Sequence, residues 1–66
     1  MQITRKSVLT GKVATLDVPC TARELAAYEA GMLIQDAMPN VPPDMREFLM
    51  SGITPDEWQA TFGEQA

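Results

Sequence analysis

The sequence predicts an α+β domain in which an N-terminal two-stranded antiparallel β-hairpin packs on three to four short α-helices. Three observations indicate this class: the first twenty residues are rich in β-branched side chains, the later apolar residues recur at helical spacing, and proline or glycine separates the helical segments. A chain of 66 residues is one small domain. We divide it into the hairpin 1–20, a helical part 21–62 and a frayed tail 63–66.

The two expected strands are residues 2–9 and 12–18, joined at Thr10-Gly11, where glycine tolerates a positive φ. A two-residue loop would place Ile3 opposite Val18. A one-residue bulge near Gly11 would give a different register. A two-stranded ribbon is not stable alone, so one face must lie on the helices. We expect that face to be formed by Ile3, Ala14, Leu16 and Val18.

The first helix is expected from Ala22 to about Ala30, after Pro19 ends the second strand. Thr21 and Glu24 have the spacing of a capping box, in which each side chain bonds the backbone of the other residue. One apolar face is predicted from Leu25, Tyr28, Met32 and Leu33. Gly31 interrupts this pattern, so residues 22–38 form either one helix or two. We favour a break at Gly31, with MLIQDAM starting a second short helix.

The next segment, NVPP, is typical of an extended connector, because a residue before proline is disfavoured in helical conformation. Pro43 suits the first position of the following helix, and Asp44 suits its positive end. Pro42 stands at the expected cap position and has no side-chain oxygen to offer. The inward stripe of this helix is predicted to be Met45, Phe48 and Leu49.

The stretch SGITPDEW carries the most specific local signals. Gly52 is the expected left-handed residue after a helix that ends near Ser51. Thr54 is the expected N-cap, Pro55 the first helical residue, and Glu57 the partner of Thr54 in a second capping box. Ile53 and Trp58 occupy the two positions of a hydrophobic staple. These rules together predict a defined angle between the last two helices, and Gly63 is expected to stop the final one.

Charge is distributed unevenly along the chain. Residues 1–20 carry three basic residues against one acidic residue, for a net charge of +2, whereas residues 21–66 carry two basic residues against eight acidic ones, for a net charge of −6. An acidic helical body argues against extensive phosphate-backbone binding.

No apolar run approaches the ~20 residues of a membrane span, and no secretory signal is apparent. With one cysteine and no such signal, we expect a cytoplasmic protein.

We predict no enzymatic activity, no cofactor and no metal. Cys20 has no histidine anywhere in the chain to activate it, and a lone thiol builds neither a disulfide nor a zinc site. The acidic residues lack the spacing of a calcium loop, and the four glycines are too far apart for a phosphate loop. The last helix begins TPDEWQ, which places two acids where a DNA-recognition helix needs base-reading or basic residues.

The functional expectation is a small non-enzymatic protein that binds a protein partner or itself, as an accessory or host-modulating factor. Five methionines and the aromatic residues are expected mainly in the core, but a body this small has difficulty covering all of them. The candidate partner-binding residues are Met38, Met50, Trp58 and Phe62. The alternative is weak nucleic-acid binding by the basic hairpin through Arg5, Lys6 and Lys12, although nucleic acid is the less favoured partner.

The segment from GMLIQDAMPN through REFLMSGITPDEW resembles a group of short, mostly uncharacterised proteins of bacteriophages and related mobile elements. Those proteins share a glycine before an LIQ-type helix, a proline, an REFL helix and a GITPEEW-type ending. Their basic strand and TG-type turn are similar to residues 5–11 here. The resemblance implies a phage or prophage context and a host-cytoplasm location, and it implies no activity or functional residue.

Overall fold

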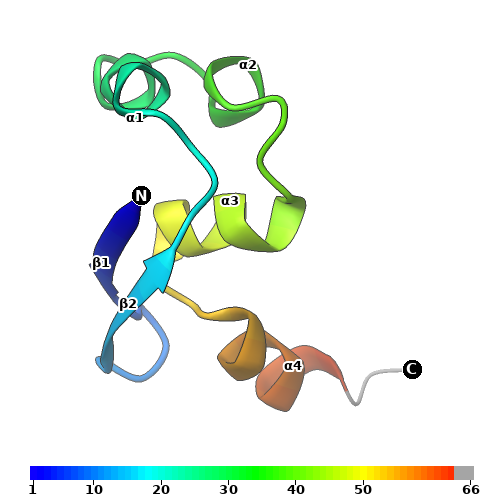
Figure 1. The fold of residues 1–66 in the computed structure, drawn as a ribbon. Coiled ribbons are helices and arrows are strands. Elements are labelled where there is room, and N and C mark those ends of the chain that lie inside the picture. Colours follow the sequence, from blue (N-terminus) through cyan, green and yellow to red (C-terminus); the bar gives the residue numbers. More distant parts are fainter. Residues whose placement is uncertain (64–66) are drawn as a thin grey trace.

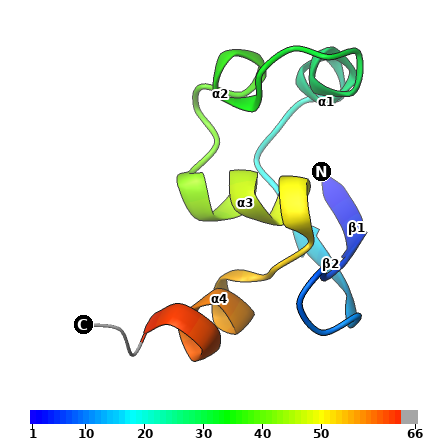
Figure 2. The same cartoon turned by 180° about the vertical axis from the view of Figure 1, so that it is seen from behind.

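The structure, a computed structural model, describes residues 1–63. A two-stranded antiparallel sheet, β1 (Gln2–Lys6) and β2 (Val13–Asp17), is followed by four helices. These are α1 (Ala22–Glu29), α2 (Ile34–Ala37), α3 (Pro43–Ser51) and α4 (Pro55–Phe62). The predicted α+β class is therefore confirmed. In Figures 1 and 2, α3 lies at the centre, with α1 and α2 on one side of it, α4 on the other, and the hairpin alongside. Residues 64–66 of the expected frayed tail lie outside the described part of the chain.

The core lies where α3 meets the hairpin and the α2 region. Phe48 and Met38 are fully buried, as are the two valines Val18 and Val41, which come from the end of the hairpin and from the connector before α3. The same cluster also contains Ile3, Cys20, Ile34, Ala37 and Leu49. The stripe predicted for α3 is confirmed, because Phe48 and Leu49 are buried and Met45 packs partly buried against them.

The hairpin register differs from the one expected for a two-residue loop. Ile3 pairs with Leu16 and not with Val18, so the strands are shifted by two residues and are shorter than predicted. The loop is wider: Ser7 N–H donates to the Lys12 carbonyl at 2.8 Å, and Val8 N–H leaves the ladder and donates to the Ser51 carbonyl in α3 at 3.0 Å. A shift of two residues preserves side-chain alternation. The expected inward face is therefore confirmed: Ile3 and Val18 are buried, and Ala14 and Leu16 are partly buried.

The predicted break between the first two helices is confirmed. Thr21 and Glu24 form the complete capping box that starts α1, and Gly31 follows the helix with a φ of +112°. A short α2 then begins at Ile34. The break removes Met32 and Leu33 from the face of α1, and both are exposed. Their predicted place on that face, which required one continuous helix, was wrong.

Candidate partner-binding site

The angle between α3 and α4 is set within three residues. Gly52 adopts a left-handed conformation with φ +77°, and its N–H donates to the Phe48 carbonyl at 2.8 Å, which closes α3. Thr54 then starts α4 by accepting a hydrogen bond from Glu57 N–H at 3.0 Å, with Pro55 at the first helical position. The predicted stop, N-cap and proline are thus confirmed. This junction turns the first turn of α4 back towards α3.

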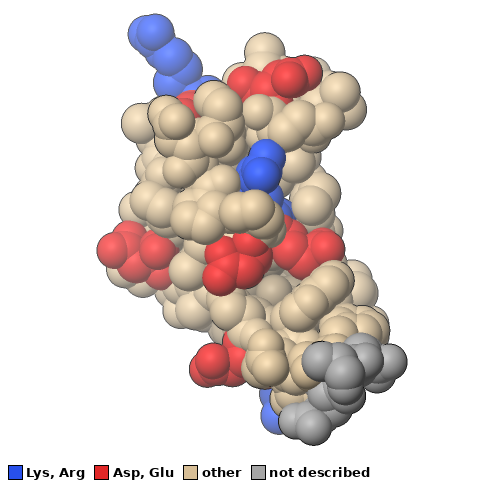
Figure 3. Space-filling model, turned by 90° about the vertical axis from the view of Figure 1, so that its right-hand side faces the viewer, with Lys and Arg blue, Asp and Glu red and all other residues tan. Residues whose placement is uncertain are grey.

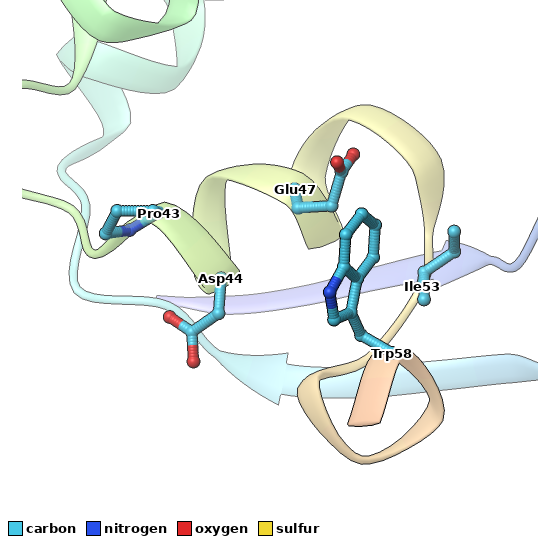
Figure 4. A pocket seen from close by; sticks show the side chains of 5 residues that line it. All are labelled: Pro43, Asp44, Glu47, Ile53 and Trp58. Carbon is cyan, nitrogen blue, oxygen red and sulfur yellow. The ribbon is translucent and has the colours of Figure 1, made fainter. Parts of the chain in front are cut away.

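An open pocket lies between α3 and the start of α4 (Figure 4). Its volume is about 310 Å³, and its walls are Pro43, Asp44, Glu47, Ile53 and Trp58. The indole of Trp58 extends from α4 towards α3, with Ile53 on one side and Asp44 on the other. The two residues assigned to the hydrophobic staple therefore both contribute to the pocket wall. Ile53 is buried, whereas Trp58 remains 41% exposed.

Trp58 and Phe62 form an exposed aromatic pair on α4. Their ring centroids are 4.6 Å apart with an interplanar angle of 51°, a geometry favoured by aromatic quadrupoles. Phe62 is 38% exposed. Met50 is 51% exposed, and helical spacing places it on the same face of α3 as Glu47, one turn further on. Three of the four candidate partner-binding residues are therefore at the surface. Met38 is a correction: it is fully buried in the core and cannot contact a partner.

The pocket lies in an acidic region. Residues 43–62 contain four acidic residues and one basic residue, Arg46, for a net charge of −3. Figure 3 shows a band of acidic groups across the middle of one face of the molecule. Within residues 1–63 the structure forms one ion pair, between the Met1 amino group and Asp17. The carboxylates of Asp44 and Glu47 at the pocket wall therefore form no ion pair with a cation of residues 1–63.

Glu57 does not complete the second capping box, so that prediction was wrong. Its carboxylate turns to the hairpin loop and accepts hydrogen bonds from the Ser7 hydroxyl and, at 2.6 Å, from the Thr10 hydroxyl. These two hydrogen bonds, with the positive charge of Lys12 as a smaller contribution, hold the pKa of Glu57 below its usual value, although partial desolvation opposes them. Glu57 thereby ties α4 to the hairpin across 47 and 50 residues of sequence.

The basic residues of the hairpin do not form one surface. Arg5 is half-buried on the helix-facing side, where its Nε donates to the Leu49 carbonyl at 3.3 Å and its Nη1 to the Thr4 carbonyl at 3.0 Å. Lys6 follows Arg5 in the strand and so lies on the opposite face. Lys12 lies in the loop near Glu57. Arg5 is therefore separated from the other two residues of the nucleic-acid alternative, whereas the Lys6 side chain reaches Gly11, next to Lys12.

Other candidate chemistry is sparse in the described residues. The Cys20 thiol is free and buried in the core. Across residues 1–63, no three side chains from His, Cys, Asp and Glu are grouped so that they could hold a metal ion. No helix in that range has the length and apolar character needed to cross a bilayer.

No protein-family model, curated protein or solved structure matches this chain. The site therefore has to be interpreted from its own geometry. Sequence reasoning missed the pocket because it assigned Asp44 to the helix dipole and left Glu47 unassigned. A usable signal was present, since Asp44 and Glu47 are three residues apart and share a helix face with Pro43.

Proposed function

We propose that this chain is a non-enzymatic interaction protein of phage type that binds a protein partner through the exposed apolar residues Met50, Trp58 and Phe62. The observation that carries the proposal is the exposed Trp58–Phe62 pair beside an open apolar pocket. Aromatic residues and methionine are enriched at protein interfaces, and tryptophan is prominent among the residues that dominate binding energy. Burial of this pair by a partner would remove its apolar surface from water.

The charge pattern supports a protein partner over a nucleic acid. Asp44 and Glu47 line the pocket beside the aromatic pair, and the segment 43–62 as a whole carries a net charge of −3, so a phosphate backbone would be repelled there. The phage setting and the host cytoplasm are also part of the proposal. Their support is the resemblance of the GMLIQDAMPN and REFLMSGITPDEW segments to phage and mobile-element proteins.

The proposal is tested by affinity capture of partners from a bacterial host lysate, followed by mass spectrometry, with native mass measurement of the purified protein for self-association. The informative variant is Trp58→Ala combined with Phe62→Ala. Its matched control is Val8→Ala with Val13→Ala, which removes two exposed apolar side chains from the hairpin. We expect a specific partner or a defined oligomer that is lost in the aromatic variant and retained in the control. A monomer that captures the same background proteins as the aromatic variant would contradict the proposal.

A further inference from the structure

The α3–α4 pocket combines an exposed aromatic ring with two carboxylates that have no cationic partner among residues 1–63. Trp58 is 41% exposed at the wall, and Asp44 and Glu47 stand on the adjacent turn of α3. Asp44 Oδ1 accepts a hydrogen bond from Met45 N–H at 2.9 Å, which uses one of its acceptor positions and leaves the other oxygen available. Pro43 and Ile53 also line the pocket and supply apolar walls. An aromatic ring, apolar walls and two carboxylate-bearing residues are therefore gathered in one opening.

These features select a particular kind of ligand group. A cation over an indole face is attracted by the ring quadrupole, and tryptophan is the strongest of the aromatic residues in this respect. The two carboxylates give the opening a negative potential that repels anions and attracts cations. A purely apolar side chain would leave both carboxylates beside a low-dielectric group with no compensating charge, which is unfavourable.

We propose that this pocket binds the guanidinium group of an arginine presented by the partner protein. The inference rests on the proposed function and specifies the chemistry of the partner. Arginine fits better than lysine because its planar group stacks on an aromatic face and its fork of N–H donors pairs with carboxylates at the edge. The pocket volume of about 310 Å³ is at the lower end of the ~300–1,000 Å³ of ligand pockets, which suits one inserted side chain.

The direct test uses a short peptide with one arginine, Gly-Arg-Gly with blocked ends, as the probe. Trp58 is the single tryptophan of the chain, so its indole N–H resonance in a ¹H–¹⁵N spectrum reports on the pocket alone. We expect a saturable shift of this resonance with a millimolar Kd, weaker binding of the lysine peptide and no saturable shift with the citrulline peptide, which has the same shape without the charge. A response that is equal for arginine and citrulline, or absent at tens of millimolar peptide, would overturn the inference.

The carboxylates are tested with matched variants. Asp44→Asn with Glu47→Gln removes both charges from the pocket, whereas Glu29→Gln with Asp36→Asn removes the same number of charges from exposed positions on α1 and α2. We expect the pocket variant to weaken arginine-peptide binding by roughly tenfold, from the loss of two exposed ion-pair contacts, and the control to change it by less than about twofold. Equal weakening in both variants would indicate a general charge effect and would overturn the site.

The same variants separate this inference from the proposed function. If the aromatic variant loses a captured partner but Asp44→Asn with Glu47→Gln retains it at full affinity, the proposed function stands and the arginine inference is overturned. Loss of the partner in both variants, together with a partner arginine whose replacement by alanine has the same effect, supports both. A second copy of this chain could offer the exposed Arg23. A concentration-dependent dimer abolished by Arg23→Ala would overturn the assignment to a different protein.

Discussion

Gly52→Ala is expected to be among the most destabilising single substitutions in this chain. Gly52 has a φ of +77°, and a Cβ at this position would lie 2.2 Å from the Lys6 carbonyl oxygen and 2.9 Å from the Ser7 nitrogen. Both atoms belong to the backbone of the hairpin, so no side-chain rotation relieves the overlap. The hairpin and the end of α3 would have to separate. That movement would also stretch the hydrogen bond from Val8 N–H to the Ser51 carbonyl.

The expected loss in the free energy of unfolding has two parts. A non-glycine residue in the left-handed region costs about 1–2 kcal/mol, and forced overpacking costs about 1–3 kcal/mol. The sum, about 2–5 kcal/mol, is a large fraction of the ~3–10 kcal/mol free energy of unfolding typical of a 66-residue domain. We therefore expect the variant to be unfolded or to unfold at a much lower urea concentration than the wild type.

Gly11→Ala is the matched control. Gly11 has the same φ of +77°, but the nearest atom to its added Cβ is the Cε of the flexible Lys6 side chain at 3.8 Å. This variant should lose only the backbone part, about 1–2 kcal/mol. Urea unfolding followed by far-ultraviolet circular dichroism measures both variants. Equal losses for Gly11→Ala and Gly52→Ala would refute the reasoning, because the contact between Gly52 and the hairpin backbone would then contribute nothing.

Three further predictions concern other parts of the molecule. Because the pKa of Glu57 is lowered in the folded state, its carboxylate stabilises the fold above the unfolded pKa of 4.5, and this stabilisation is lost as pH falls through the lower folded value. The difference in urea midpoint between wild type and Glu57→Gln should therefore shrink on acidification. A difference that stays constant with pH would contradict this. Trp58→Ala should lower the free energy of unfolding by about 1–3 kcal/mol and not by the ~3–5 kcal/mol of a core aromatic, because two-fifths of the residue is already exposed to water. Urea unfolding measures this loss, and a larger value would show that the ring is buried. The Cys20 thiol should react slowly with a thiol reagent in the folded protein and rapidly in denaturant, because it is buried; fast reaction in native buffer would refute its place in the core.

The residues that begin and end the helices were predictable from sequence. Thr21 caps α1, Gly31 breaks the chain after it, Pro43 begins α3, and Gly52 with Thr54 sets the junction with α4. Each of these features depends on backbone conformation and on hydrogen bonds that span at most four residues. Such interactions form in nearly the same way whatever the rest of the chain does. The inward faces of the hairpin and α3 were likewise predictable, because they follow from the fixed periods of strands and helices.

What sequence reasoning missed depends on contacts between distant segments. The hairpin pairs two residues out of the expected register, with Val8 N–H bonded to the Ser51 carbonyl in α3. The Glu57 carboxylate bonds the hydroxyls of Ser7 and Thr10 instead of the backbone of Thr54. Contacts between distant segments also decide which methionines are in the core, since Met38 is buried and Met50 is exposed. Local sequence rules do not predict these outcomes, because each group could bond or pack with either a nearby or a distant partner of similar strength. Only the packing of α3 against the hairpin, with α4 turned back beside it, decides which partner is within reach.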